Sequence, residues 1–564
     1  MVTDTNTEQA APVRETAAQR RAKPSFLEVA QATAENFGVC KRPIPMRVED
    51  PRTWTVSYIA APCKSTVESV CPACAKQARH LRMAQCREGW HLDHEPVDER
   101  RETTDWQRKI LAARADLFND YQAAKADGDE ERMADIAAAV AVVDSDLRDT
   151  GLRGPLPALE PQLRKRRTRS TRRLHDAPSL PRKKVSRNTI RDAYAGKHRP
   201  GMLITLTLPS YGAINREGAK DVAGKTCSDG SPRRPDDYDY TRAARDIVHF
   251  GKLFDRWVQN MRRAVGRDLQ YFTVVEPQKR GAPHVHVLVR TDLPRELVIK
   301  VTEATYHQVW WPHFDHEVYT GDSMPVWDQD KATFLDPRTR RPLTSWDQAL
   351  DTMDAVDDLA PAHTMRFGVQ VDPRHIQGLV PGEKADRTIA YVTKYLTKSI
   401  AEIVEPQSVR AAVHYDRLHA ELRHTPCSPR CPVWLRYGII PKGATAKTIP
   451  GRCRGKAHRR DTLGLPGRRV LVSRRWTGKT LPDHKADRAE FVRQLLADVG
   501  IEKPDTSHLR VTPVEPGDQQ VPPREHLILA AIGQRTTWRA EYTMALLAAN
   551  PPGPQEPSPN QQAA

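Results

Sequence analysis

The stretch of residues 276–290 constrains the fold of this chain more than any other part of its sequence. It reads Glu-Pro-Gln-Lys-Arg-Gly-Ala-Pro-His-Val-His-Val-Leu-Val-Arg, a β-hairpin pattern with a Gly-Ala-Pro turn. Because a strand has a period of two residues, His284 and His286 point to one face and the valines point to the other. Two imidazoles on one face can bind a divalent metal, and Glu276 on the paired strand can supply a third, anionic ligand. Taken alone, a His-x-His strand is more often two polar residues facing solvent.

A second motif, Tyr-Val-Thr-Lys-Tyr-Leu-Thr-Lys, follows more than a hundred residues downstream. Its tyrosines, Tyr391 and Tyr395, are four residues apart, and so are its lysines, Lys394 and Lys398. Each pair therefore shares one face of a helix, one turn apart. Taken alone, this pattern also fits an amphipathic helix with tyrosines packed inside and lysines in solvent.

One chemistry uses both motifs. A tyrosine hydroxyl has a pKa of about 10 and needs activation before it acts as a nucleophile. A metal can polarise a DNA phosphate, and lysines can stabilise the phenolate or the phosphate oxygens. The combination predicts metal-assisted nicking of single-stranded DNA through a phosphotyrosine ester.

Four blocks of the chain resemble known proteins. In order, Leu203–Leu208 (Leu-Ile-Thr-Leu-Thr-Leu), Glu276–Val289 and Tyr391–Lys398 resemble the three motifs of the HUH endonucleases that initiate rolling-circle replication. A basic block, Arg452–Leu481, resembles the C-terminal part of replication initiators from actinobacterial plasmids and integrative conjugative elements. The resemblance covers roughly residues 55–100 and 200–495.

The resemblance implies which residues bind the metal. His284, His286 and Glu276 correspond to the family's metal ligands, and Mg²⁺ or Mn²⁺ is the implied ion. Two imidazoles and a carboxylate suit these ions better than a structural zinc. Gln278 stands where related phage initiators often have a histidine, so a third imidazole at that position is excluded.

The resemblance also implies that a tyrosine of the third motif attacks the DNA. Tyr391 and Tyr395 each have a lysine three residues later, so spacing alone does not choose between them. We interpret Tyr395 as the main nucleophile and Tyr391 as a second nucleophile or a phosphate ligand. Lys394 and Lys398 would stabilise the charge that develops on the oxygens.

The function implied is that of a replication initiator. Such a protein binds an origin, nicks one strand, stays on the 5′ phosphate and leaves a 3′-OH for a host polymerase. The sequence contains no Gly-x-x-x-x-Gly-Lys-Ser/Thr motif, so we expect a host helicase to open the duplex. The alternatives are a conjugative relaxase or a single-strand transposase with the same core, or a DNA-binding regulator without catalytic activity.

The charge of the chain favours a polyanionic partner. The 564 residues carry a formal net charge of +17, and residues 164–191 alone contain 12 arginines or lysines, which suits contact with the DNA backbone. The sequence has no uninterrupted run of 18 apolar residues, and its first residues lack a basic start and an apolar core. We therefore expect a cytoplasmic protein without a membrane partner.

Two groups of cysteine and histidine residues are candidates for structural Zn²⁺, because thiols rather than disulfides are expected in the cytoplasm. The first group is Cys63, Cys71, Cys74 and Cys86, in which a Cys-x-x-Cys turn supplies two ligands. The second group is Cys427, Cys431, Cys453 and His458. The alternative for each group is a loop with free thiols.

The sequence predicts an α+β fold with an HUH endonuclease core, in which helices pack over an antiparallel sheet and Cys-rich and basic segments flank it. The predicted core elements are strands at 202–208, 270–275, 284–290 and 366–371, and helices at 243–261, 297–311 and 387–403. The predicted regions are a disordered N-terminus (1–50), a Cys-rich segment (51–100), a helical insert (101–150), a basic Pro/Arg-rich linker (151–199), the catalytic domain (200–405), a basic DNA-binding region (406–499) and a mostly disordered tail (500–564). Residues 321–361 are expected to be an acidic inserted loop, and Trp476 is expected to contact DNA beside its basic neighbours.

Overall fold

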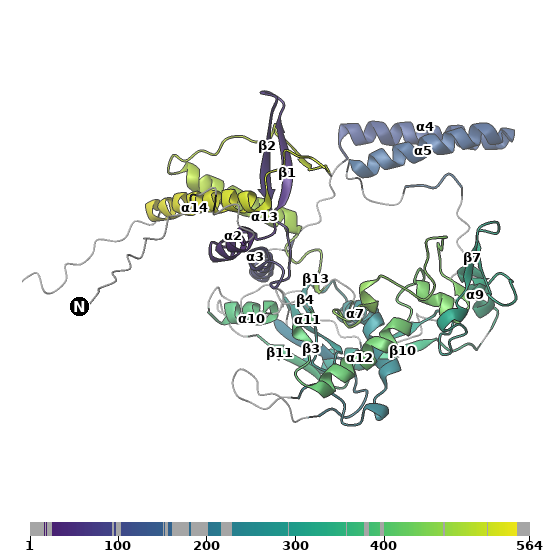
Figure 1. Ribbon diagram of the computed structural model, residues 1–564. Helices are drawn as coiled ribbons and strands as arrows, with labels where there is room; N and C mark the ends of the chain where they lie inside the picture. Colours follow the sequence, from purple (N-terminus) through teal and green to yellow (C-terminus); the bar gives the residue numbers. More distant parts are fainter. Residues whose placement is uncertain are drawn as a thin grey trace, which may run out of the picture. The chain divides into compact units, whose positions relative to one another are not determined.

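The computed structural model divides the chain into two compact units, residues 1–95 with 179–564 and residues 96–178 (Figure 1). The structure describes residues 25–92, 103–150, 201–215, 228–291, 293–356, 358–376, 383–394, 400–465, 469–515 and 517–549, and the short pieces 16, 19, 95–96, 152, 156–160 and 180–181. Within these ranges, no helix is both long and apolar enough to cross a membrane.

A five-stranded antiparallel sheet organises the first unit, with the strand order β11-β3-β5-β4-β13. Its strands are β3 (Met202–Thr207), β4 (Tyr271–Pro277), β5 (Pro283–Val289), β11 (Val371–His375) and β13 (Val470–Val472). Helices pack over this sheet, which confirms the predicted α+β class. The predicted domain boundary at residue 405 differs from the structure, because β13 pairs with β4 and belongs to the same sheet.

One face of the sheet is mostly apolar. Ile204, Val285 and Val287 lie on this apolar face and are fully buried in the largest hydrophobic core. The helices that contribute to that core are α7 (Tyr240–Val265), α8 (Arg295–Ala304) and α12 (Val409–His424). The alternation of apolar residues in the strands therefore determines which side of the sheet these helices cover.

The opposite face carries both histidines and is called the histidine face here. Its apolar residues, among them Phe272 and Leu288, form a second core with α3 (Pro72–Trp90) and α10 (Glu383–Thr393). Trp476 is fully buried in this core, with its ring centroid 6.1 Å from that of Trp90. The expectation that Trp476 contacts DNA is therefore wrong, because its large apolar ring fills the space between α3 and the sheet.

The contact between α3 and Trp476 depends on a glycine. A Cβ added to Gly89 would lie 2.3 Å from the Trp476 ring and 2.5 Å from its carbonyl oxygen. Gly89→Ala should therefore lower the free energy of unfolding by about 1–3 kcal/mol through overpacking. The control is Gly251→Ala in α7, where a Cβ meets nothing within 4 Å and should stabilise the helix by about 0.5–1 kcal/mol. Thermal denaturation of both variants measures the change in stability. Equal changes in Tm for the two variants would contradict the close packing of Gly89 against Trp476.

The two ends of the chain form a common substructure, the terminal module, defined by helices α2 (Phe26–Asn36), α13 (Leu481–Ala497) and α14 (Arg524–Ala549) and strands β1 (Ile44–Asp50), β2 (Thr55–Ala61) and β14 (Arg510–Pro513). The strands form an antiparallel sheet in the order β14-β1-β2. Ala30 and Ala34 of α2 pack against Ile528 and Ile532 of α14. The predicted disorder of residues 1–50 and 500–564 is thus wrong for the parts described, because each end buries its few apolar residues against the other.

The region after α8 also differs from the prediction. The helix expected at 297–311 ends at Ala304, and the next residues form strand β6 (Tyr306–Val309), which pairs with β10 (His363–Arg366). The expected acidic loop contains the elements η4 (Gly321–Ser323), β7 (Val326–Asp328), β8 (Thr333–Leu335), β9 (Thr344–Ser345) and α9 (Trp346–Asp354). Trp346 of α9 packs against Trp434, which also contacts Phe314, so this segment shares a separate core with residues on either side of it in the sequence.

The remaining elements of the first unit are short. They are η3 (Pro235–Asp237), α11 (Ile400–Ile403), η5 (Pro432–Tyr437), β12 (Ile439–Ile440) and η6 (Lys456–His458). Strand β12 pairs in parallel with β9. The helix predicted at 387–403 corresponds to α10 and α11, and residues 395–399 between them lie outside the described residues.

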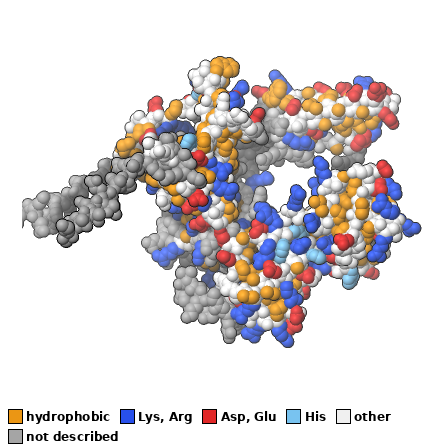
Figure 2. Space-filling model, in the orientation of Figure 1, with side chains coloured by type: hydrophobic (Ala, Val, Ile, Leu, Met, Phe, Trp, Pro, Cys, Tyr) orange, Lys and Arg blue, Asp and Glu red, His pale blue; other side chains and the backbone are white. Residues whose placement is uncertain are grey.

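The second unit is a pair of helices, α4 (Asp105–Asp127) and α5 (Glu130–Asp149), in the region predicted to be a helical insert. Gly128 ends α4 in the left-handed conformation, with φ of 73°, which lets the chain turn directly into α5. Tyr121 and Val140 are buried between the helices. Figure 2 shows acidic and basic side chains mixed with apolar ones on the visible surface of this pair.

Candidate metal centre and tyrosine helix

Three candidate metal ligands meet on the histidine face. In the antiparallel register of β4 and β5, Glu276 lies directly opposite His284, and Val274 lies opposite His286. The Nε2 atoms of the two imidazoles are 3.1 Å apart, and one donor atom from each of the three residues lies within 4.8 Å of the other two. The hairpin therefore brings together the carboxylate and both imidazoles that the sequence singled out.

Burial disfavours the charged forms of these three groups. Glu276 and His286 are buried, and Oε1 of Glu276 is a buried oxygen with no hydrogen-bond partner among the described residues. Burial raises the pKa of Glu276 to about 7, against the opposing effect of Arg469 and Lys394. Burial also lowers the pKa of His284 to about 3, and it lowers the pKa of His286. Neutral imidazoles next to a carboxyl oxygen without a partner fit a divalent cation, which would supply the missing charge.

Thr205 of β3 orients one of the imidazoles. Its Oγ1 lies 3.0 Å from Nδ1 of His286, its neighbour in the β3–β5 register. When Nδ1–H of His286 donates to Thr205, the lone pair of Nε2 is free to bind a metal. The sequence reasoning did not include Thr205, although the alternation of Leu203–Leu208 places it on the histidine face.

Helix α10 brings Tyr391 to the same place. Ile389 and Val392 anchor this helix in the second core, and Tyr391 between them is 54% exposed. The Tyr391 ring lies edge-on to the imidazole of His286, with 5.5 Å between the ring centroids. Tyr395 and Lys398, the other members of the motif, lie outside the described residues.

Two cations act on the carboxyl group of Glu276. Lys394, exposed at the end of α10, and Arg469, at the start of β13, both lower its pKa. The backbone of Arg469 is anchored to β4, because its carbonyl oxygen accepts a 2.8 Å hydrogen bond from the N–H of Val275. Arg469 was not among the predicted site residues, because only the pairing of β13 with β4 brings it close enough to act on Glu276.

A pocket of about 800 Å³ is lined in part by neighbours of the candidate metal ligands. Thr207, which pairs with His284 in the sheet, and Gln278, two residues after Glu276, both line it. Arg233 and Lys279 supply cationic side chains to its wall. The basic run at 164–191 lies outside the described residues except for 180–181, and Figure 2 shows basic side chains spread over much of the visible face.

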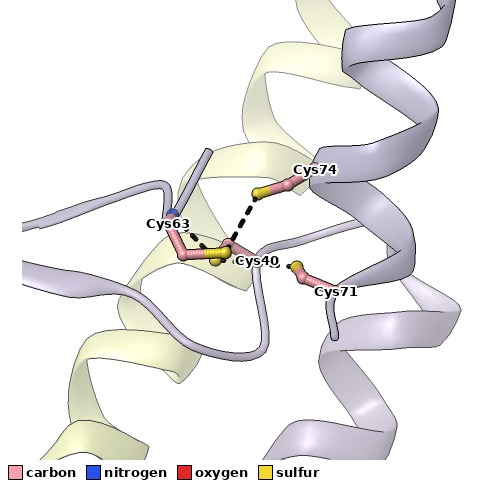
Figure 3. A group of neighbouring side chains, drawn as sticks. All are labelled: Cys40, Cys63, Cys71 and Cys74. Carbon is pink, nitrogen blue, oxygen red and sulfur yellow. Dashed lines mark hydrogen bonds between the residues drawn. The ribbon is translucent and has the colours of Figure 1, made fainter. Parts of the chain in front are cut away.

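The first cysteine group differs from the predicted set in one member. Cys63, Cys71 and Cys74 come together, but their fourth neighbour is Cys40 (Figure 3). Cys86 instead lies fully buried in the second core. Its place in the predicted set is wrong because Cys74 and Cys86 lie on the same helix, twelve residues or about 18 Å apart along its axis. The sequence reasoning missed Cys40 because we expected the first 50 residues to be disordered.

The second group contains all four predicted residues. The sulfur atoms of Cys427 and Cys453 are 3.9 Å apart, and Sγ of Cys431 is 3.4 Å from Nε2 of His458. All four donor atoms lie within 4.8 Å of one another. This group joins the end of α12 and η5 to η6.

Comparison with known proteins gives two matches. A family model described as "Replication initiator protein, pSAM2" (RepSA) matches residues 26–534. A replication initiator protein from Streptomyces ambofaciens is 27% identical over 237 residues, covering 37% of this chain and 44% of that protein. The chain thus spans less than half of the length of this relative. No solved structure matches the chain.

Proposed function

The chain belongs to the RepSA family of replication initiator proteins, and we propose that it acts by nicking one strand of its origin through a tyrosine. The observation that carries this proposal is the position of Tyr391 next to the group of Glu276, His284 and His286. A nucleophile and a set of metal ligands on one face are what the cleavage of a phosphodiester requires. We also infer that the antiparallel sheet with its histidine strand is an HUH endonuclease core.

The two imidazoles and the carboxylate would hold Mg²⁺ or Mn²⁺, which when bound withdraws electron density from the scissile phosphate. The hydroxyl oxygen of the tyrosine attacks phosphorus, loses its proton and forms a new O–P bond. The bond from phosphorus to the 3′ oxygen breaks, and that oxygen takes up a proton to become a 3′-OH. The products are a 5′-phosphotyrosine and a primer end for a host polymerase.

Lys394, Arg233 and Lys279 have different roles in the proposed reaction. Lys394 would stabilise the phenolate or a phosphate oxygen, since it follows Tyr391 by one helical turn. Arg233 and Lys279 would hold the DNA strand in the pocket that they help to line. A host helicase would open the duplex in front of the 3′ end.

The test is a covalent-adduct assay with the full chain. Labelled single strands from the origin are incubated with Mg²⁺ or Mn²⁺, and protein that carries DNA is separated under denaturing conditions. We expect an adduct on the 5′ fragment and a free 3′-OH on the other fragment. A chain that shifts origin DNA in native gels but forms no adduct with either metal would be a DNA-binding regulator, and the nicking proposal would be wrong.

The hydrogen bond between Thr205 and His286 gives a sharper test of the candidate metal ligands. Thr205→Val keeps the side-chain volume but removes the partner of His286 Nδ1, so metal affinity should fall by about 10-fold. Thr273→Val is the matched control, because Thr273 lies on β4, on the opposite face of the same sheet, and its hydroxyl has no partner among the described residues. Nicking activity is measured as a function of Mn²⁺ concentration for both variants. If both need the same Mn²⁺ concentration for half-maximal activity, Thr205 does not orient His286 for metal binding.

A further inference from the structure

We propose that Cys40, Cys63, Cys71 and Cys74 bind one structural Zn²⁺ that joins the terminal module to helix α3. The four side chains point toward one another from three separate segments (Figure 3). Cys40 lies between α2 and β1, Cys63 follows β2, and the other two open α3. A metal bound here would therefore connect segments that are distant in the sequence.

The distances fit tetrahedral zinc. With Zn–S bonds of about 2.3 Å, the sulfur atoms of a tetrahedral site are about 3.8 Å apart. The sulfur atoms of Cys63 and Cys74 are 3.7 Å apart, and those of Cys71 and Cys40 are 3.8 Å apart. A disulfide would need an S–S distance of about 2.05 Å, and all four cysteines are free.

The surroundings also favour a metal. Cys71 precedes α3 directly and is followed by Pro72, so the Cys-x-x-Cys turn is held by the start of a helix. The backbone N–H of Cys63 donates to Sγ of Cys40 at 3.3 Å, an arrangement that stabilises a thiolate.

The local core is too small to hold these segments without a ligand. Among the described residues, the cluster of buried apolar side chains here adds Ala73 alone to the four cysteines. Such small side chains bury little apolar surface, so they contribute little to the contact between the segments. A zinc ion would replace the missing hydrophobic core, as in other small modules.

Separate distances support a second structural zinc site at Cys427, Cys431, Cys453 and His458. A tetrahedral zinc site with mixed ligands has S–S distances of about 3.8 Å and S–N distances of about 3.6 Å. The Sγ atoms of Cys427 and Cys453 are 3.9 Å apart, and Sγ of Cys431 lies 3.4 Å from Nε2 of His458. Nδ1 of His458 lies 2.8 Å from the carbonyl oxygen of Leu422, which leaves Nε2 free for the metal. The chain should therefore bind about two zinc ions.

Metal analysis of three forms of the full chain tests the proposal. We expect about two equivalents of zinc in the wild type, one in Cys40→Ser and two in Cys86→Ala. Cys86 is the matched control, because the structure places this buried cysteine outside the group. Two equivalents in Cys40→Ser, or one in Cys86→Ala, would overturn the assignment of Cys40.

A measurement on the wild type covers the case in which Cys40→Ser does not fold. The native chain is treated with a thiol-alkylating reagent before and after incubation with a zinc chelator, and labelled cysteines are identified by mass spectrometry. Cys63, the partly exposed member of the group, should become labelled only after chelation, while Cys86 stays protected. Equal labelling of Cys63 with and without the chelator would overturn the zinc site. Neither readout depends on nicking, so failure of this proposal is distinct from failure of the proposed function.

Discussion

Replacement of Tyr391 and Tyr395 together by phenylalanine is expected to abolish the covalent DNA adduct, with nicking reduced by about 10⁴-fold or more. Phenylalanine keeps the ring that packs near His286 but lacks the oxygen that attacks phosphorus. The loss should therefore occur without a change in thermal stability or in origin binding. Nicking is measured with labelled origin strands, and stability is measured by thermal denaturation.

The single variants separate the two tyrosines. Because Tyr391 lies beside His286, we expect Tyr391→Phe alone to lower adduct formation at the first cleavage, and mass spectrometry of the wild-type adduct should place DNA on this residue. The sequence-based interpretation favoured Tyr395, so an adduct on Tyr395 alone would support that assignment instead. Tyr542→Phe on α14 is the control and should nick like the wild type. An adduct formed by the double variant would show that neither tyrosine is the nucleophile.

Replacement of His286 by alanine should have the second largest effect. The variant removes one of two imidazoles whose Nε2 atoms are 3.1 Å apart, and Glu276 with one histidine binds a divalent ion weakly. We expect nicking to fall by about 10³-fold at a fixed Mn²⁺ concentration, because the lost charge stabilisation is several kcal/mol. Origin binding should change little, since we expect basic side chains rather than His286 to contact the DNA phosphates.

The matched control is His316→Ala, a change of an exposed histidine away from the histidine face. It should nick at the wild-type rate with the wild-type Mn²⁺ requirement. A tenfold or greater excess of Mn²⁺ should partly restore activity to His286→Ala but not to the double tyrosine variant, because only the first defect is one of metal affinity. Equal nicking by His286→Ala and the wild type would exclude this residue as a ligand.

Much of the candidate site follows from local sequence. The alternation of His284 to Val289 places both imidazoles on one face, and the short turn before them aligns Glu276 with His284. Both features depend on the period of a strand and on the length of a turn, which neighbouring residues determine. The helical spacing of Ile389 and Val392 similarly predicts a helix with one buried side.

Other assignments depend on contacts between distant segments. Cys40 joins three cysteines that come from two other segments, and Arg469 comes near Glu276 only because β13 adds to the sheet. Trp476 looked like a DNA-binding residue from its basic neighbours, yet it is buried beside Gly89. Local composition does not contain this information, because burial depends on which elements pack together.

The sequence by itself determined the hairpin with its two histidines, the tyrosine helix and the α+β class, because strand and helix periods are properties of consecutive residues. Only the tertiary structure decided that Tyr391 lies against His286, that Cys40 replaces Cys86, and that the two ends of the chain form one module. Each of these results is a contact between residues far apart in the sequence. Such contacts form when separate apolar surfaces are buried together, and the pattern along a single segment does not specify its partner.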